Sequence, residues 1–264
     1  MAIIPVTIGK LEYLTAEGIC APHCFTTRLG GVSAGHLDSL NIGIHRGDSR
    51  ENVLENYRIL GNALDFSPKN AVLSHQTHTD IVLQVGKAQH GAGLFGPELS
   101  ECDALITNVA GTALVIFTAD CTPILFHDPV TGAVGAAHAG WRGTAAGIAA
   151  KTVRAMVDAY GSRPEDIRAA IGPNIGQCCF QTDADVPEAM RKALGKDAEP
   201  FIHPSGHKYY VNLKEINALW LRRAGLQHIE ISSECTACAP RRFWSHRITG
   251  GERGSQGAII VCKE

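Results

Sequence analysis

Three side chains that can bind a metal ion, His78, Cys121 and His138, are each held in a short peptide of unusual composition. Cys121 and His138 lie at the ends of apolar runs that we interpret as buried strands. Two imidazoles and one thiolate suit Zn²⁺ or copper, and a site with three protein ligands keeps a coordination position open for water or substrate. These residues therefore predict an enzyme with a metal in its active site.

The spacing of the three residues leaves a second interpretation open. They are scattered along the chain and lack the closely spaced ligands that mark a zinc finger. Each of them is also compatible with a separate role as a hydrogen-bonded or buried side chain. A shared site requires the fold to bring them together, which their spacing alone does not settle.

Three arginines are candidates for binding an anion. Arg142 precedes Gly143 at an expected helix start, where free backbone N–H groups and a guanidinium would together form an anion site. Such a site would suit phosphate, although an ordinary surface cation fits the same pattern. Arg28 and Arg247 are similar candidates.

The nine cysteines of the chain are better explained as thiols, metal ligands or redox groups than as a disulfide framework. Cys235 and Cys238 form a C-x-x-C pair, but no second C-x-x-C or paired-histidine pattern completes a structural zinc site. The adjacent Cys178 and Cys179 could take part in thiol chemistry. Packing as a small buried hydrophobe is the expected role for most of the cysteines.

Length and charge narrow the classes of function. At 264 residues and 28.2 kDa the chain can bury a large core without disulfides or a structural metal, and we expect one domain over residues 1–264. The formal net charge of -2 and the lack of a basic run argue against nucleic acid as a partner. The sequence shows neither a signal peptide pattern nor an apolar window long enough to span a membrane, so a cytoplasmic location is expected.

Apolar runs of strand length alternate with amphipathic segments, without a strict order. Strands are expected at residues 6–8, 23–27, 71–74, 81–85, 104–107, 113–118, 123–127, 133–137, 167–171, 229–232, 242–247 and 258–261. Helices are expected at residues 49–64, 144–160, 186–194 and 213–224. This pattern predicts an α/β (α+β) protein with a mixed β-sheet covered by helices.

Several peptides of the chain resemble the YfiH-type family, also called the laccase-domain or multicopper polyphenol oxidase family. They occupy residues 27–33, 39–41, 76–78, 103–107, 119–123, 138–143 and 171–173. A looser match continues over residues 243–257, so the resemblance covers nearly the whole chain. The peptide His-Ala-Gly-Trp-Arg-Gly is highly specific.

The resemblance implies a single α/β sandwich with a mixed sheet, and it implies that His78, Cys121 and His138 are metal ligands and catalytic residues. Members of the family are associated with phosphorolysis of adenosine, inosine, guanosine and methylthioadenosine, with adenosine deamination, and with a laccase-like oxidation of phenols. The implied function is a metal-dependent purine nucleoside enzyme that takes a nucleoside and phosphate, with Zn²⁺ as cofactor. The alternative is a copper enzyme that oxidises phenols, because the same ligands suit Cu²⁺.

The resemblance also implies substrate contacts. Arg28, Asn41 and Arg142 lie in the matching peptides and are the expected substrate-binding residues, with the two arginines as candidates to hold phosphate. The chain departs from the family pattern at Thr79, where glycine is expected, and at Ile248, where a second arginine is expected. These departures concern the substrate pocket more than the metal site.

Overall fold

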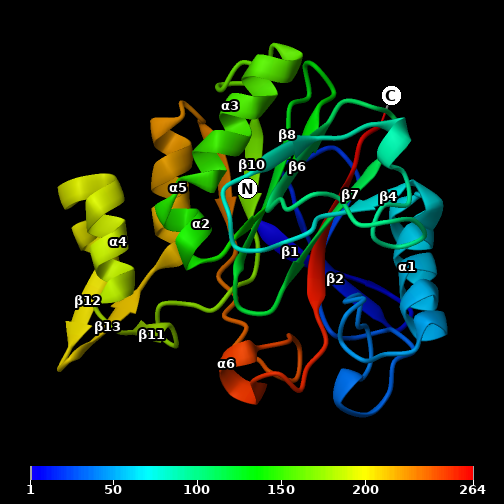
Figure 1. Ribbon diagram of the computed structural model, residues 1–264, viewed down its shortest axis with the longest axis horizontal. Helices are drawn as coiled ribbons and strands as arrows, with labels where there is room; N and C mark the ends of the chain where they lie inside the picture. Colours follow the sequence, from blue (N-terminus) through cyan, green and yellow to red (C-terminus); the bar gives the residue numbers. More distant parts are fainter. Residues whose placement is uncertain (1, 264) are drawn as a thin grey trace.

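Two six-stranded β-sheets face each other at the centre of the protein (Figure 1), which a computed structural model describes for residues 2–263. The first sheet has the order β1-β2-β3-β15-β7-β4, with strands Ile3–Ile8, Leu11–Ala16, His23–Thr26, Gln256–Val261, Ala113–Thr118 and Ala71–Leu73. The second has the order β14-β10-β8-β9-β6-β5, with strands His228–Ile231, Arg168–Ile171, Thr122–His127, Val134–Ala139, Ala104–Thr107 and Val82–Gln84. Both sheets combine antiparallel and parallel pairs, so the mixed strand arrangement expected from the sequence is confirmed.

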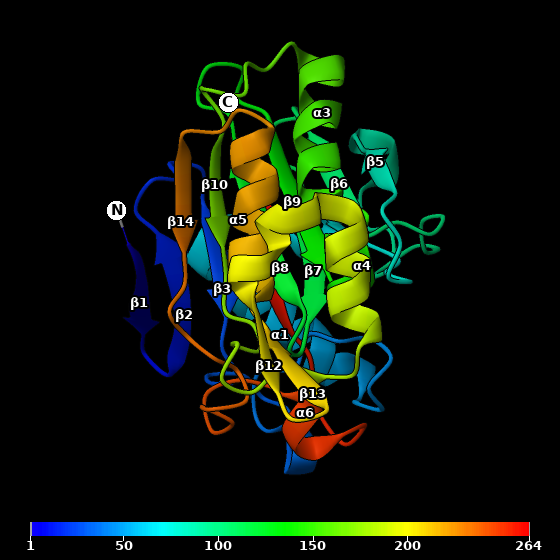
Figure 2. The ribbon, with the colours of Figure 1, turned by 90° about the vertical axis from the view of Figure 1, so that its left-hand side faces the viewer.

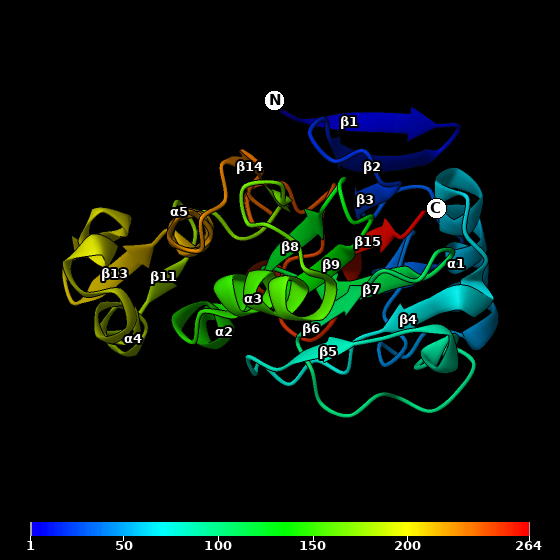
Figure 3. The same ribbon diagram turned by 90° about the horizontal axis from the view of Figure 1, so that it is seen from above.

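Helices cover the outer faces of both sheets, which gives the molecule four layers (Figure 3). The helices are α1 Arg50–Leu64, α2 Trp141–Ala145, α3 Ile148–Tyr160, α4 Asp185–Leu194, α5 Leu213–Arg223 and α6 His246–Thr249. Short 3-10 helices lie at Gly35–Leu37, Pro68–Asn70, Lys87–Gln89 and Gly195–Phe201. The α1 helix packs on the first sheet, whereas α3 and α5 pack on the second. No helix within residues 2–263 is long and apolar enough to cross a membrane.

The main apolar core fills the space between the two sheets. Leu114 and Ile116 of β7 pack into it from the first sheet, and Leu125 of β8 packs into it from the second. The alternate residues of these strands face outward, Val115 into the cluster with α1 and Phe126 into the cluster with α3. Strands that are buried on both faces are apolar along their whole length, which is why the sequence marks these strands so clearly.

The helix expected over residues 144–160 is in fact two helices. Gly147 separates α2 from α3 with a φ of 76°, a left-handed conformation that interrupts the helical hydrogen bonds and favours glycine. The ring of Trp220 packs against this glycine. A Cβ atom at position 147 would lie 3.4 Å from the ring. The first of the two helices, α2, begins at Trp141, and Gly140 separates it from the end of β9.

The strand expected at residues 242–247 does not form. The backbone N–H of Trp244 donates to the Gln256 side chain at 2.6 Å, and the N–H of Arg247 donates to the Asp120 carboxylate at 2.7 Å. Because side chains take up these donors, the segment runs as a loop that leads into α6. This loop is held beside the turn that follows β7.

A third, antiparallel sheet lies at the side of the molecule with α4 (Figure 2). Its order is β11-β13-β12, with strands Gln181–Thr182, Lys208–Val211 and Ile202–Ser205. These strands and β2 were not expected from the sequence. The strands of the third sheet are short and mostly half-exposed or exposed, so they lack the continuous apolar run of the central strands.

A buried histidine in β3 is expected to make the stability of the fold depend on pH. His23 accepts a hydrogen bond from the backbone N–H of Ala16 at 2.8 Å, and its Nδ1 lies 2.7 Å from the Ala21 carbonyl. Burial lowers the pKa of His23 from 6.5 to about 4. Between these pH values only the unfolded chain takes up the proton, so the free energy of unfolding should fall by about 3 kcal/mol as the pH drops from 6.5 to 4.

Urea unfolding of the wild type and of His23→Gln at pH 7, 5.5 and 4.5 checks this expectation. The glutamine oxygen can accept the same backbone hydrogen bond but does not titrate. The variant should therefore lose less stability on acidification than the wild type. Parallel losses in the two proteins would contradict a role for His23.

Candidate metal centre

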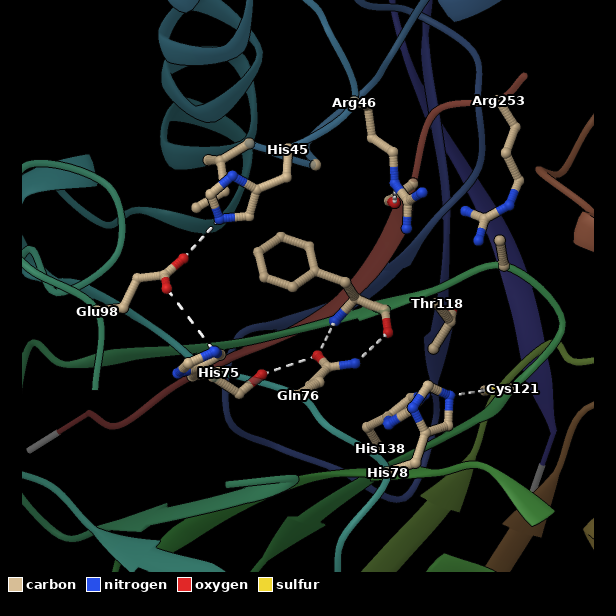
Figure 4. A pocket seen from close by; sticks show the side chains of 16 residues that line it. His45, Arg46, His75, Gln76, His78, Glu98, Thr118, Cys121, His138 and Arg253 are labelled. Carbon is tan, nitrogen blue, oxygen red and sulfur yellow. Dashed lines mark hydrogen bonds and ion pairs between the residues drawn. The ribbon is translucent and has the colours of Figure 1, made fainter. Parts of the chain in front are cut away.

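His78, Cys121 and His138 converge at one end of the two central sheets. Their candidate ligand atoms all lie within 4.8 Å of one another, and the Cys121 Sγ is 4.0 Å from the His78 Nε2. The rings of His78 and His138 meet edge to face, with centroids 5.0 Å apart. Figure 4 shows the three side chains together at one side of a pocket. The fold therefore brings together three residues that are far apart along the chain.

The site forms where the chain passes from one sheet to the other. Cys121 lies in the turn between β7 of the first sheet and β8 of the second, and His138 lies near the end of β9, which pairs with β8. His78 lies in the loop that connects β4 with β5 and so also joins the two sheets. Each side chain is thus anchored close to a paired strand, which limits how far it can move.

Two residues at the site adopt left-handed backbone conformations that are uncommon outside glycine: His78 with a φ of 64° and Asp120 with a φ of 89°. Carboxylates hold both of them in place. The Asp103 carboxylate accepts from the backbone N–H of His78 at 3.1 Å. The Asp120 carboxylate accepts from the hydroxyls of Thr236 at 2.6 Å and Ser245 at 3.0 Å. The surrounding hydrogen bonds therefore fix the conformation that aims His78 and Cys121 at each other.

Asp103 is a functional residue that the sequence analysis missed. It is fully buried, and its Oδ1 accepts from the Nδ1 of His138 at 2.7 Å. Its Oδ2 accepts from both the backbone N–H of Thr79 at 2.7 Å and the Thr79 hydroxyl at 2.9 Å. The signal available in the sequence was an acidic residue directly before the largely apolar strand β6.

The donor set fits a metal ion. Because Asp103 engages the Nδ1 of His138, the Nε2 of that ring remains available as a ligand, and this carboxylate–histidine arrangement is typical of metal-binding histidines. Two imidazole nitrogens and a thiolate at this spacing suit Zn²⁺ or copper. The donor set does not distinguish the two metals. His78, Cys121 and His138 are therefore the residues that could hold the ion.

Gly140 is required by the close approach of the chain segments at this site. A Cβ atom at this position would lie 2.8 Å from the Cδ2 of His78 and 3.4 Å from the Sγ of Cys121. The first of these distances is shorter than a normal contact, so any larger residue would displace the His78 ring. This explains why a glycine follows β9 at this point of the chain.

The electrostatics of the site favour an ionised thiol. Burial opposes ionisation of Cys121, but the charge of His138 and hydrogen bonds to both histidines outweigh it and lower the pKa of the thiol. Burial likewise opposes protonation of His138, but the charge of Cys121 and the hydrogen bond to Asp103 raise its pKa. The same bond, working against burial, lowers the pKa of Asp103 to about 2. A thiolate is the form of cysteine that binds metal.

A polar cavity of about 220 Å³ opens on one side of the three residues. Arg46 and Arg253 both line it, as do the neighbouring groups His45, His75 and Glu98 (Figure 4). The Nε2 of His45 lies 2.6 Å from Glu98, and the Nε2 of His75 lies 3.8 Å from the same carboxylate. Figure 4 places Glu98 on one side of the cavity and both arginines toward the other side. The cavity thus offers a carboxylate at one side and cationic groups at the other.

A second cavity of about 320 Å³ also borders Cys121. The side chains of Trp141, Phe180, Ile175 and Leu213 give it aromatic and aliphatic walls, and Arg247 adds a cation. His78, Ala119, Cys121 and Arg253 line both cavities. The candidate metal centre therefore borders both a polar cavity and a largely apolar one.

The three expected substrate-binding residues are not among those that line these cavities. Arg28 donates all its guanidinium hydrogen bonds to the carbonyls of Asp38 and Pro240 and stacks on the Trp244 ring at 3.8 Å. Arg142 is exposed and stacks on the Trp141 ring at 4.2 Å. Neither guanidinium group lines the two cavities, although Arg142 contacts Trp141, a residue of the second cavity.

Asn41 is fully buried and has a structural role in the cavity wall. Its side-chain oxygen accepts from the backbone N–H groups of Gly43 at 3.0 Å and Ser255 at 2.9 Å, and its amide group donates to Asp48 at 3.0 Å. Because these partners use its hydrogen-bonding groups, Asn41 positions the segment that carries Arg46.

Known proteins are similar to this chain over most of its length. The family model described as multi-copper polyphenol oxidoreductase laccase matches residues 22–263. Purine nucleoside phosphorylase YlmD from Geobacillus stearothermophilus is 40% identical over 244 residues, which cover 90% of this chain and 89% of that protein. Purine nucleoside phosphorylase YfiH from Escherichia coli is 35% identical over 231 residues, which cover 88% of this chain and 89% of that protein. The crystal structure of the hypothetical protein YfiH from Bacillus licheniformis matches with a TM-score of 0.93 at 35% identity, covering 98% of this chain and 99% of that one.

Proposed function

The chain belongs to the multi-copper polyphenol oxidoreductase laccase family, as its motifs predicted, and from this membership we propose that it is a metal-dependent purine nucleoside phosphorylase. Relatives that match over most of the chain carry that name. The observation that supports the proposal most directly is the placement of Cys121 between a cationic cavity and an aromatic one. A nucleoside and phosphate need a site with these two characters.

His78, Cys121 and His138 would hold the ion, which we propose to be Zn²⁺. When bound there, the ion supplies a Lewis acid with an open coordination position that can activate water or polarise a substrate group. The protein's own contribution is to keep the three ligands in place. Asp103 does this for His138 and for the loop around His78 through its hydrogen bonds.

The purine base would occupy the apolar cavity. Trp141 and Phe180 offer aromatic faces on which a purine can stack, and Ile175 and Leu213 complete the apolar surface. The guanidinium of Arg247 is held at this cavity by hydrogen bonds to the carbonyls of Cys179 at 2.7 Å and Gln181 at 3.1 Å. A purine bound in this way would have its sugar directed toward the polar cavity beyond Cys121.

Phosphate would bind to Arg46 and Arg253. The Nε of Arg253 is buried and has no hydrogen-bond partner among the described residues. Burial and the nearby charge of Arg46 lower the pKa of Arg253 to about 10, because two cations lie together there. An anion between the two guanidinium groups would supply the missing partner and offset the repulsion. Arginine can do this with two parallel hydrogen bonds to phosphate oxygens.

Glu98 provides the third element of the proposed substrate site. Its carboxylate lies across the polar cavity from the arginines, and the hydrogen bond from His45 lowers its pKa, so it is ionised at neutral pH. An ionised carboxylate accepts hydrogen bonds and can bind the hydroxyl groups of a ribose. This arrangement would orient the sugar between the base and the phosphate.

The substrate range follows from the shared purine ring. We infer that adenosine, inosine, guanosine and methylthioadenosine are cleaved by phosphate, and that adenosine is also deaminated at the same centre. Zinc-loaded protein should release free base from each nucleoside only when phosphate is present, whereas it should convert adenosine into inosine without phosphate. Chromatography of the products measures both reactions. Release of free base at the same rate without phosphate would contradict phosphorolysis.

Arg253→Ala is expected to raise the KM for phosphate by about 10- to 100-fold, the effect of losing a hydrogen bond to a charged group. The KM for the nucleoside should change less, because the purine is proposed to bind in the other cavity. Arg154→Ala is the matched control, since Arg154 is exposed on α3 and pairs only with Asp158 at 2.8 Å. Steady-state kinetics with each substrate varied in turn measures both constants. An unchanged KM for phosphate in the Arg253 variant would remove the arginine from the proposed site.

A copper-dependent oxidation of phenols is the second candidate function. It is supported by the description of the matching family and by the donor set, which also suits Cu²⁺. Affinity favours Cu²⁺ over Zn²⁺ at such ligands, so copper acquired during purification could generate oxidase activity. Zinc-loaded and copper-loaded protein should therefore be compared on adenosine with phosphate and on a phenol under oxygen. Nucleoside cleavage with zinc and no phenol oxidation would favour the first function.

A further inference from the structure

Four cysteine thiols form a second cluster outside the centre described above. The Sγ atoms of Cys178, Cys179, Cys235 and Cys238 all lie within 4.8 Å of one another. The Cys238 Sγ is 3.6 Å from the Cys178 Sγ and 3.4 Å from the Cys179 Sγ. From the sequence, packing was the expected role for most of the cysteines, with thiol chemistry or metal binding left open for these four. In the structure they are exposed or half-buried and contact one another.

The topology of the second sheet explains why the two cysteine pairs meet. Strands β10 and β14 are parallel neighbours, with Ile171 paired with Ile231 at their ends. The C-terminal ends of both strands therefore lie at the same end of the sheet. Beyond them, an isolated β-bridge pairs Asn174 with Cys235. The Cys178-Cys179 pair follows one strand and the C-x-x-C pair follows the other. The partner that the C-x-x-C lacks in sequence is thus supplied by a neighbouring strand.

We propose that these four cysteines bind a second metal ion, a Zn²⁺ held in a closed tetrahedral site of four thiolates. With Zn–S distances of about 2.3 Å, the sulfurs of such a site lie about 3.8 Å apart. The sulfur distances of 3.4 and 3.6 Å are close to this value. Four protein ligands leave no open coordination position, so the ion has a structural role rather than a catalytic one.

Groups around the cluster match what a metal thiolate site requires. The backbone N–H of Gly176 donates to the Cys235 Sγ at 3.1 Å, a contact that orients a thiolate ligand. Four thiolates carry more negative charge than a divalent ion neutralises. The Lys214 side chain is buried nearby, borders the same surface cavity as Cys178 and Cys235, and donates to the Ser232 carbonyl at 2.7 Å. Its ammonium group offsets part of the excess charge.

The ion would stabilise the position of one wall of the apolar cavity. Phe180, which lines that cavity, directly follows Cys179, and the Cys179 carbonyl accepts from Arg247 at 2.7 Å. Thr236, which lies within the C-x-x-C, donates to the Asp120 carboxylate at 2.6 Å. The second ion thus connects two loops that contact the residue next to Cys121. The site itself stands on its own geometry and does not depend on which reaction occurs at Cys121.

Zinc analysis in a Cys121→Ala background tests this site separately from the first. Protein purified without added metal, in reducing and oxygen-free buffer, should retain one zinc ion per chain. Cys121→Ala/Cys238→Ser should retain none, whereas the control Cys121→Ala/Cys20→Ser should still retain one, because Cys20 is an exposed cysteine outside both groups. Zinc content that is zero in the Cys121→Ala protein, or unchanged by Cys238→Ser, would overturn the proposal.

Cobalt provides a measurement that needs no further variant and so remains valid even where Cys238→Ser fails to fold. Cys121→Ala protein freed of metal with a chelator and titrated with Co²⁺ should bind one ion and show the absorption of tetrahedral cobalt thiolate. A spectrum without sulfur-to-cobalt charge transfer would overturn the proposal. Peptide mapping of the unreduced protein distinguishes the main alternative, because a disulfide between Cys238 and Cys178 or Cys179 would exclude four thiolate ligands.

Discussion

Replacing Cys121 with alanine is expected to remove the ion from the candidate metal centre and to lower kcat/KM for nucleoside phosphorolysis by on the order of 10³-fold. Cys121 supplies the one sulfur among the three candidate ligands, and ionisation of its thiol is favoured by the adjacent imidazoles. Two imidazoles alone form an incomplete site with weaker affinity. Metal analysis and steady-state kinetics of the purified variant measure both effects.

The matched control is Cys20→Ser, because Cys20 is exposed and belongs to neither cysteine group. This variant should keep the metal content and the activity of the wild type. Circular dichroism should show that both variants are folded, since Cys121 lies in a turn and not in the apolar core between the sheets. Full activity in Cys121→Ala protein that has lost the ion of this centre would refute the role assigned to this residue.

Asp103→Asn is expected to weaken metal binding by about 10- to 100-fold and to reduce the free energy of unfolding by about 3 kcal/mol. The carboxylate accepts hydrogen bonds from the backbone N–H groups of Thr77, His78 and Thr79, from the Thr79 hydroxyl, and from His138. Asparagine has an NH2 group in place of one carboxylate oxygen. The groups that donate to that oxygen in the wild type would then meet another donor and lose their hydrogen bonds. Either the contacts of Oδ1 with His78 and His138 or the contacts of Oδ2 with Thr77 and Thr79 would be lost, and in both cases the loop that carries His78 loses hydrogen bonds.

Asp128→Asn separates the two expected effects. Asp128 is likewise fully buried and accepts from the backbone N–H groups of Val130 and Thr131 and from the Thr131 hydroxyl, but it lies in the turn between β8 and β9. This variant should lose stability without a change in metal affinity. Urea unfolding and competition with a zinc chelator measure the two quantities. Equal losses of metal affinity in both variants would mean that Asp103 acts only through stability.

The central strands and the long helices could be predicted from the sequence because local patterns determine them. The β7, β8 and β9 strands are largely apolar, and α1 repeats its buried residues Val53, Tyr57, Leu60 and Leu64 at helical spacing after a serine cap. The loop at residues 242–247 could not be predicted in this way. Its hydrogen bonds go to Asp120 and Gln256, which are distant in sequence.

The sequence alone also determined which residues could bind a metal and which family motifs they belong to, because ligand chemistry is a property of the side chain. Only the tertiary structure decided which of them meet. It joined His78 and Cys121 to His138 through two sheets, placed Asp103 behind them, and put Arg46 and Arg253 in the lining of the cavity.

The four clustered cysteines show the same division. Their number and the C-x-x-C spacing could be read from the sequence, but the link between Cys178-Cys179 and Cys235 depends on the parallel pairing of β10 with β14. The physical reason is that strand pairing and sheet packing are interactions between residues far apart along the chain. Local sequence patterns determine where a helix or strand forms and which of its faces is buried. Which residues lie next to the ends of that helix or strand depends on the packing of the whole fold.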